Sequence, residues 1–363
     1  MSVPSVGVEE EFLLVDPRTG EPVPRNAEVA RHAAERGVDL QLELTTCQVE
    51  TATDKADTST GLREQITRLR RLTAEAAEAA GASLLAVGLP PTVPHHFPIT
   101  DTPRYHRIAD RFGMIAHEQG ICGCHVHVEV PDRESAIAVS NRLRPWLPLL
   151  LALAANSAIY RNADTGYASW RSVLWARWPS AGPPPHLDSA AHYDAVVAMM
   201  LESGAMLDDR MVYWDVRPSS KFPTLEVRVA DVPATAAETV LMATLVRASV
   251  MTALAAHGRG EPVPRIDDHA LRAAYWKAAH DGLDGQVIDV FDRWAPAPTA
   301  RVLGQWLAVL QPALDELGDA EWVHAELGRI LQAGNGAMRQ RRAWREREDI
   351  ADVLAAAAAA TLR

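Results

Sequence analysis

The stretch VGVEEEFLLV (Val6–Val15) places three consecutive glutamates inside an apolar run near the start of the chain. Residues two apart in a strand point to the same face, so Glu9 and Glu11 project together while Glu10 projects the other way. Two carboxylates about 4 Å apart repel by about 4 kcal/mol at an effective dielectric constant of about 20. We therefore expect a cation beside them; the alternative is a sheet edge open to water, where both are solvated.

Further acidic residues lie in or beside other apolar strands. Glu43 is on the polar face of LQLEL, Glu50 follows in CQVET, and Glu226 shares one face of TLEVRVAD with Arg228. Several glutamates in runs this apolar indicate a polar site on the inner face of a sheet. Hard oxygen ligands of this kind suit Mg²⁺ or Mn²⁺.

The strand-like run CGCHVHVEV adds two histidines to this pattern. His125 and His127 share a face, whereas Cys122 and Cys124 fall on the opposite one. One strand cannot wrap all four side chains around a single zinc ion, which disfavours a zinc site. Histidines satisfied within the core remain the alternative for either residue.

The remaining candidate site residues have cationic side chains. Arg217 and Lys221 flank the loop RPSSKFP, and Arg171 lies in the aromatic-rich segment DTGYASWRSVLW. An arginine can fork onto a carboxylate or a phosphate, although a surface salt bridge is the commoner fate of any one arginine. The sequence contains neither GxxxxGK(S/T) nor GxGxxG. If a nucleotide binds, metal ions and arginines must hold its phosphates.

Composition narrows the class of protein. The chain has 363 residues, a formal net charge of −11 and 48% hydrophobic residues, which is typical of a soluble globule. The sequence has no clustered basic patch, which argues against nucleic acid as a partner. The longest apolar run, residues 146–160, is shorter than the roughly 20 residues needed to span a bilayer and predicts a buried helix. Three cysteines and a start without signal-peptide features predict a cytoplasmic protein.

The order of predicted elements favours one domain, residues 1–363, of mixed strands and helices over 1–235 and mainly helices over 236–363. Strands are expected at residues 6–15, 40–44, 83–88 and 122–130, and a hairpin at 211–216 and 224–232 with residues 217–223 as its loop. Helices are expected from residue 62 to Gly81 and at residues 236–257, 299–317, 321–332 and 341–362. The proline-rich segment 89–103 is expected to be an ordered loop.

The motifs together resemble a known family, the carboxylate–amine ligases of the type-2 glutamate–cysteine ligase group, which are relatives of glutamine synthetase. The resemblance covers most of the chain: GVEEEF, LTTCQVET, GCHVHV, DTGYASWRS with RWPSAGPP, DVRPSSKFPTLEVRVAD and GNGAMRQRRAW. It implies an α+β fold like that of glutamine synthetase and the guanido kinases. In that fold a curved, mostly antiparallel sheet forms a funnel backed by helices, with a helical C-terminal third.

The resemblance also implies the contents of the site. ATP and two or more Mg²⁺ ions, with Mn²⁺ as an alternative, would bind inside the funnel. One ion would be shared by Glu9, His125 and Glu226, and another by Glu11, Glu43 and Glu50. Arg228 would face the transferred phosphate, and Arg171 and Arg217 would hold phosphoryl or carboxylate oxygens. Apart from the resemblance, the position of His127 beside His125 suggests that it orients substrate or phosphate, and we expect the loop cation Lys221 to contact substrate.

The implied reaction is an ATP-dependent ligation. ATP would phosphorylate the γ-carboxylate of glutamate, and an amine such as cysteine would attack the acyl phosphate. The partners would be small amino acids and amines, with neither nucleic acid nor membrane, and a homodimer is compatible with compact family members. Two alternatives stay open: a guanidino-type phosphotransferase of related fold, and a non-catalytic nucleotide- or amino-acid-binding relative.

Overall fold

The computed structural model describes residues 3–94 and 96–363 and is built around one antiparallel sheet. Its strand order is β2-β3-β1-β5-β9-β8, and β4 also pairs with β1. The ten-residue β1 is central because β3 pairs along one side of it, whereas β5 and β4 share the other side. The strands of this sheet are β1 (Val6–Val15), β2 (Gln41–Leu42), β3 (Gln48–Ala52), β4 (Ser83–Leu85), β5 (Gly123–Glu129), β8 (Val216–Pro218) and β9 (Thr224–Asp231).

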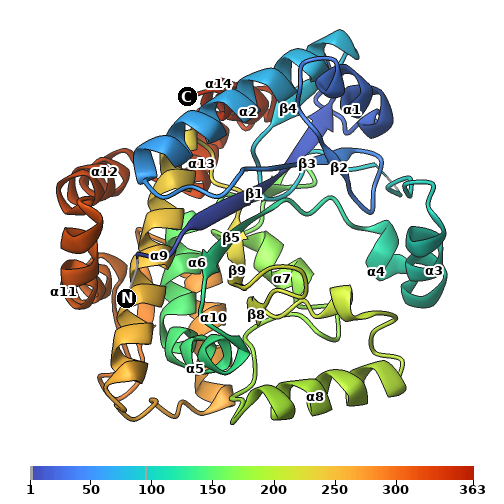
Figure 1. Cartoon of the computed structure of the whole chain (residues 1–363). Helices are drawn as coiled ribbons and strands as arrows, with labels where there is room; N and C mark the ends of the chain where they lie inside the picture. Colours follow the sequence, from blue (N-terminus) through green and yellow to red (C-terminus); the bar gives the residue numbers. More distant parts are fainter. Residues whose placement is uncertain (1–2, 95) are drawn as a thin grey trace.

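Helices cover one face of this sheet and surround it on several sides (Figure 1). The helices are α1 (Asn26–Ala34), α2 (Ser59–Ala79), α3 (Pro103–Phe112), α4 (Met114–His117), α5 (Arg133–Leu143), α6 (Leu147–Ala154), α7 (Trp170–Trp175), α8 (Ala190–Glu202), α9 (Ala236–Gly258), α10 (Asp268–Asp281), α11 (Thr299–Leu317), α12 (Ala320–Ala333), α13 (Gly336–Arg347) and α14 (Ile350–Thr361). Short 3-10 helices are η1 (Arg144–Trp146) and η2 (Asp209–Met211), and two small hairpins are β6 (Ile159–Tyr160) with β7 (Ala163–Asp164) and β10 (Gln286–Asp289) with β11 (Ala295–Pro298).

The main core lies between the sheet and the helices α2, α5, α6 and α9. Alternate residues of β1, β5 and β9, such as Val8, Val126 and Val227, are buried on this helix face. Helix α9 packs against β1 and β5, and α11 and α12 pack on its other side. Its 23 residues are apolar and long enough to cross a membrane, but 89% of its most apolar window is buried inside the molecule. Helix α9 is therefore a core helix.

The opposite face of the sheet carries the polar side chains, and we call it the cleft face. A wall beside the cleft face is formed by the helices α3, α7, α8 and η2. A second apolar cluster, which includes Ile108, Trp178 and Met211, holds these helices together. In Figure 1, α3 and α8 lie on the side of the molecule opposite α11 and α12. The sheet thus separates a packed core from an open, polar surface.

Several sequence-based expectations need correction. The predicted strand 211–216 is reduced to Val216–Pro218, because the preceding segment is held by the loop at Gly182, whose carbonyl accepts from Asp215 N–H at 2.8 Å. Arg217 therefore lies in a strand and only residues 219–223 form the loop. The predicted strand 40–44 ends at Leu42, because Leu44 O accepts from Thr100 N–H at 2.9 Å and pairs outside the sheet.

The predicted helix 341–362 is also wrong as one element. It divides into α13 and α14 at Glu348, whose φ of 53° is in the left-handed region. Asp349 then caps α14 by accepting from Ala351 N–H at 2.9 Å. The 83–88 strand is shortened to β4, and the apolar run 146–160 gives α6 followed by β6. The predictions for β1, β5, β9, α2, α9, α11 and α12 are confirmed to within a few residues.

Candidate metal and substrate cleft

A cleft of about 1150 Å³ lies over the cleft face of the sheet. Its floor is made by alternate residues of β1, β3, β5 and β9, and its walls come from α3, α7, α8 and the 219–223 loop. All eleven residues predicted for the site line this cleft: Glu9, Glu11, Glu43, Glu50, His125, His127, Arg171, Arg217, Lys221, Glu226 and Arg228. The volume is large enough for more than one small ligand.

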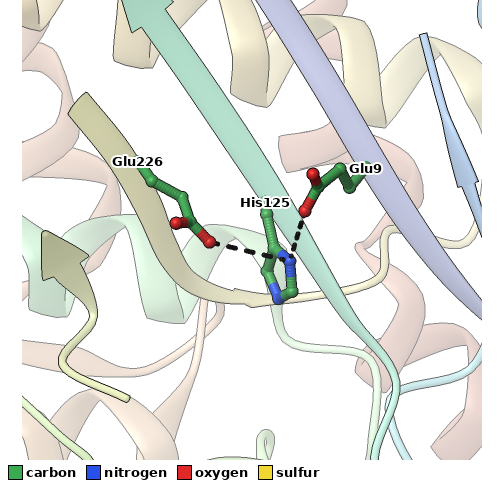
Figure 2. Close-up of side chains that lie close together, drawn as sticks. All are labelled: Glu9, His125 and Glu226. Atoms are coloured by element: carbon green, nitrogen blue, oxygen red, sulfur yellow. Dashed lines mark hydrogen bonds and ion pairs between the residues drawn. The ribbon is translucent and has the colours of Figure 1, made fainter. Parts of the chain in front are cut away.

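Three neighbouring strands bring Glu9, His125 and Glu226 together on the floor (Figure 2). Glu9 and His125 are direct partners in the β1–β5 register. His125 Nδ1 lies 3.2 Å from Glu9 Oε2 and 4.0 Å from Glu226 Oε1. One ligand atom from each residue falls within 4.8 Å of the others, so the three could hold one cation.

A second group uses the other side of the same imidazole. Glu11 and Glu50 are paired across β1 and β3, and Glu11 Oε1 lies 3.7 Å from His125 Nε2. Ligand atoms of Glu11, Glu50 and His125 again lie within 4.8 Å of one another. The other oxygen of Glu11 accepts from Gly123 N–H at 2.6 Å, which fixes the carboxylate. The two groups are therefore adjacent.

Glu43 lines the cleft but lies outside both of these groups. Burial and the charge of Glu11 raise its pKa to about 8. Burial and the charge of Glu43 likewise raise the pKa of Glu50 well above its usual range. The second close group therefore consists of Glu11, Glu50 and His125, and the implied sharing of one ion by Glu11, Glu43 and Glu50 stays a prediction.

Glu10 faces the helices, as strand alternation requires. Its carboxylate accepts two bonds from Arg70, at 3.0 and 2.6 Å, and one from Thr239 at 2.6 Å. Arg70 also donates to three backbone carbonyls near the C-terminal end of β9 and of α14. This pair is fully satisfied within the core and belongs to the scaffold.

Two arginines clamp Glu226 from the cleft face. Arg217 donates to both carboxylate oxygens, at 2.7 and 3.2 Å, and Arg228 pairs with Oε1. Burial opposes ionisation of Glu226, but Arg228 and Arg217 outweigh it and hold its pKa well below the usual range. Arg228 Nη1 also lies 3.3 Å from His125 Nδ1. Glu226 is therefore an ionised carboxylate at neutral pH.

His127 and Lys221 occupy different parts of the cleft. His127 Nε2 lies 3.4 Å from Glu9 Oε1, and its Nδ1 lies 3.3 Å from Thr224 Oγ1. Burial favours neutral His127, but Glu9 and Glu226 raise its pKa, while the two histidines lower the pKa of Glu9 against its burial. Lys221 is exposed on the rim loop.

Arg171 stands on the wall at the start of α7. It is buried, its Nη1 lies 3.8 Å from Asp231 Oδ1, and its guanidinium carbon lies 5.9 Å from the ring centre of Trp175. Its Nε is buried and has no hydrogen-bond partner among the described residues. Arg171 is thus a buried cation with a free donor beside the acidic floor.

The chemistry of the donor set fits a hard divalent cation. The floor offers carboxylate oxygens and one shared imidazole, whereas the three cysteines are buried outside the cleft lining. Oxygen-rich sites of this kind suit Mg²⁺ and Mn²⁺ better than zinc or copper. The expectation against a sulfur-ligated zinc site agrees with this placement.

Several lining residues were not predicted from the sequence. Arg104 and Tyr105 reach the cleft from α3, Tyr213 from the segment before β8, and Gln48 from β3. Tyr105 Oη donates to Leu42 O at 3.0 Å and so ties the wall to the strand that precedes Glu43. No spacing in the sequence marks Arg104, Tyr105 and Tyr213, because they enter the cleft from a helix and a loop whose packing the sequence does not specify. Gln48 could have been found, since it lies two residues from Glu50 and shares its face of β3.

Comparison with known proteins shows which family this chain resembles. The sequence-family model of glutamate–cysteine ligase family 2 matches residues 5–356. The chain is 67% identical over 359 residues to "Putative glutamate--cysteine ligase 2-3" of Mycolicibacterium smegmatis, which covers 99% of this chain and 98% of the relative. It is 59% identical over 362 residues to "Putative glutamate--cysteine ligase 2-1" of Nocardia farcinica, covering 100% and 94% of the two chains.

Two solved structures share the fold at low sequence identity. The glutamate–cysteine ligase of Francisella tularensis in complex with AMP matches with a TM-score of 0.72 and 13% identity, covering 99% of this chain and 88% of that one. A bifunctional glutathione synthetase from Pasteurella multocida matches with a TM-score of 0.71 and 15% identity, covering 98% and 52%. The predicted fold class and the family resemblance are both confirmed.

Proposed function

The chain belongs to glutamate–cysteine ligase family 2 and is a ligase that forms a C–N bond, and we propose that it uses ATP to join the γ-carboxylate of glutamate to an amine such as cysteine. One observation carries this proposal: two adjacent groups of acidic donors share His125 on the floor of a cleft rimmed by arginines. The AMP held by the Francisella tularensis enzyme supports adenine nucleotide as the energy source.

We assign the acidic floor to divalent cations. Glu9, His125 and Glu226 would hold one ion, and Glu11 and Glu50, with Glu43 beside them, would hold another. Bound Mg²⁺, or Mn²⁺ in its place, supplies charge neutralisation at the phosphates of ATP. Without such cations, the ionised carboxylates of this floor would repel an anionic nucleotide and an anionic amino acid alike.

The arginines complete the neutralisation from the floor and the walls. Arg228 pairs with Glu226 at the centre of the floor and faces the space above it, so we place the transferred phosphoryl group there. Arg217, on the neighbouring strand, and Arg171, on the opposite wall, would hold phosphoryl or carboxylate oxygens. A planar guanidinium suits this role because it presents parallel N–H donors to an oxyanion.

The reaction needs two transfers because a free carboxylate resists attack by an amine. A γ-carboxylate oxygen of glutamate attacks the terminal phosphorus of ATP, the bond to the bridging oxygen breaks, and ADP leaves. The amine nitrogen then attacks the acyl carbon, loses a proton and expels phosphate, which leaves the amide. The protein supplies positions and charge, and no side chain acts as nucleophile.

Two further residues are assigned to substrate. His127 is fixed against Glu9 and Thr224, and its imidazole lines the cleft, where it would orient a substrate oxygen. Lys221 is exposed on the rim loop, so we expect it to meet the outer part of a ligand. Residues 1–363 would work as one catalytic domain in the cytoplasm, as a homodimer, on small amino acids and amines.

The test is product analysis with purified protein, ATP and Mg²⁺. We expect ADP and free phosphate to accumulate only when glutamate and an amine from a panel that includes cysteine are both present. A guanidino-type phosphotransferase would instead accumulate a stable phosphorylated product without free phosphate. If no acid–amine pair gave turnover while ADP still bound, a non-catalytic binding protein would replace the proposed ligase.

A further inference from the structure

Arg171 and Arg70 are both buried arginines beside a carboxylate, yet they differ in one respect. Arg70 donates hydrogen bonds to Glu10 and to three backbone carbonyls, so its guanidinium is fully used. Arg171 is 2% exposed, and its Nε is buried without a hydrogen-bond partner among the described residues. Buried donors left unused are costly and call for an explanation. The guanidinium of Arg171 is therefore held in place by something other than its own hydrogen bonds.

Asp231 is the acidic group nearest to that fork. It ends β9, is 0% exposed, and its Oδ1 lies 3.8 Å from Arg171 Nη1. At this distance the two groups form an ion pair but no hydrogen bond. The carboxylate therefore attracts the guanidinium electrostatically while leaving its N–H groups available to a ligand.

Two serines connect Asp231 to the backbone that carries Arg171. The hydroxyls of Ser157 and Ser169 donate to Asp231, at 2.7 and 2.8 Å. Ser157 Oγ in turn accepts from Arg171 N–H at 3.0 Å, and Asn156 N–H donates to Asp231 at 2.8 Å. One carboxylate thus fixes both the main chain at the start of α7 and the charge at the end of the Arg171 side chain.

The C-terminal motif GNGAMRQRRAW braces this arrangement from behind. Gln340, in α13, donates to Asn156 O at 2.9 Å and accepts from Ala158 N–H at 2.9 Å. Gly336 packs so closely on Asn156 that a Cβ there would lie 2.0 Å from its Oδ1. The motif therefore fixes the 156–158 loop that supplies Asn156 and Ser157 to the carboxylate.

Two glycines leave the space that the pair needs. A Cβ on Gly88 would lie 2.8 Å from the carboxylate of Asp231, and one on Gly123 would lie 2.4 Å from Arg171 Nη2. Gly123 also donates to Glu11, a residue of the acidic floor. Arg171 is thus packed directly against the edge of that floor.

From these contacts, and building on the proposed ligase function, we propose that Asp231 is a positioning residue that holds the Arg171 guanidinium in the cleft as a receptor for a substrate oxyanion. Asp231 itself touches no substrate. The oxyanion comes from either a phosphoryl group or a carboxylate, because each can present two oxygen acceptors to a guanidinium.

The test compares Asp231→Asn with Glu10→Gln, which removes a buried carboxylate charge from an arginine pair on the other face of the same sheet. Binding of Mg²⁺–ADP and of L-glutamate is measured by calorimetry on the full chain. We expect D231N to weaken one of the two by about tenfold or more, the scale on which orienting residues act, and E10Q to leave both unchanged. A loss with ADP identifies a phosphoryl ligand, and a loss with glutamate identifies a carboxylate.

A double-mutant cycle separates a positioning role of Asp231 from a general loss of structure around the site. In an Arg171→Met background, D231N should have no further effect on affinity, because the residue it acts through is gone. Equal effects of D231N in both backgrounds, or equal losses in E10Q and D231N, would overturn the proposal. If D231N fails to fold, Ser157→Ala removes the relay to the main chain and keeps the carboxylate.

A crystal structure of D231N, or of S157A in its place, decides the matter without reference to any ligand. The guanidinium of Arg171 is expected to leave its position beside Gly123, and an unmoved guanidinium would overturn the positioning role. Wild-type protein that binds neither ADP nor glutamate would contradict the proposed ligase function, and this structural result would still stand on its own.

Discussion

Crowding of carboxylates on the cleft floor has a thermodynamic consequence in the metal-free protein. The pKa of Glu43 is raised from 4.5 to about 8 by burial and by the charge of Glu11. Between these two values the folded protein keeps a proton on Glu43 that the unfolded chain has released. Folding then takes up a proton, so the free energy of unfolding falls as the pH rises from 4.5 towards 8.

The size of the effect follows from the pKa. Each pKa unit corresponds to about 1.4 kcal/mol, so the penalty grows to at most about 5 kcal/mol at pH 8. Glu43→Gln removes the titrating group. We expect this variant to match the wild type near pH 4.5 and to exceed its free energy of unfolding by several kcal/mol at pH 8, measured by urea denaturation in EDTA.

Control and refutation use the same assay. Glu78→Gln, on the exposed surface of α2, removes one glutamate far from the cleft and should follow the wild-type pH curve. Mg²⁺ at pH 8 should stabilise the wild type more than E43Q, because a cation offsets the same repulsion that the mutation removes. Parallel pH curves for wild type and E43Q would refute the reasoning.

Three further substitutions separate the site from the scaffold. Glu226→Gln should lower kcat by about a hundredfold or more while circular dichroism stays native, because it removes a charge from the proposed metal group; near wild-type turnover would remove Glu226 from the site. Gly123→Ala should lower kcat/KM by about tenfold or more, because its Cβ would lie 2.4 Å from Arg171 Nη2; unchanged steady-state kinetics would mean that Arg171 is not needed there. Glu10→Gln should cost about 3 kcal/mol in urea unfolding by leaving Arg70 underpaired, with turnover retained; a loss of kcat without a loss of stability would contradict its scaffold role.

Strand periodicity explains why the floor of the cleft could be predicted. A strand has a side-chain period of two, so VGVEEEFLLV specifies that Glu9 and Glu11 share one face and Glu10 the other. The same rule places His125 and His127 together. Pairing of β1 with β5 then brings Glu9 opposite His125. From the sequence, the proximity of these two residues is implied only by the family resemblance.

Other features depend on where the chain leaves the sheet or on contacts between distant segments. Glu43 follows the end of β2 at Leu42, and the next residues pair with the 98–100 segment, a placement that strand periodicity alone does not predict. The role of Gln340 depends on a hydrogen bond to Asn156, 184 residues earlier in the chain. No local pattern encodes such a bond, so the bracing of Arg171 became visible only in three dimensions.

The central claim, that the γ-carboxylate of glutamate is activated by phosphorylation, is tested most directly by following its oxygen. Glutamate labelled with oxygen-18 in the γ-carboxylate is incubated with the enzyme, ATP, Mg²⁺ and an accepted amine, and the released phosphate is analysed by mass spectrometry. Because the acyl phosphate leaves with the oxygen that attacked ATP, each phosphate should carry one labelled oxygen. Amide formation with unlabelled phosphate would contradict the account.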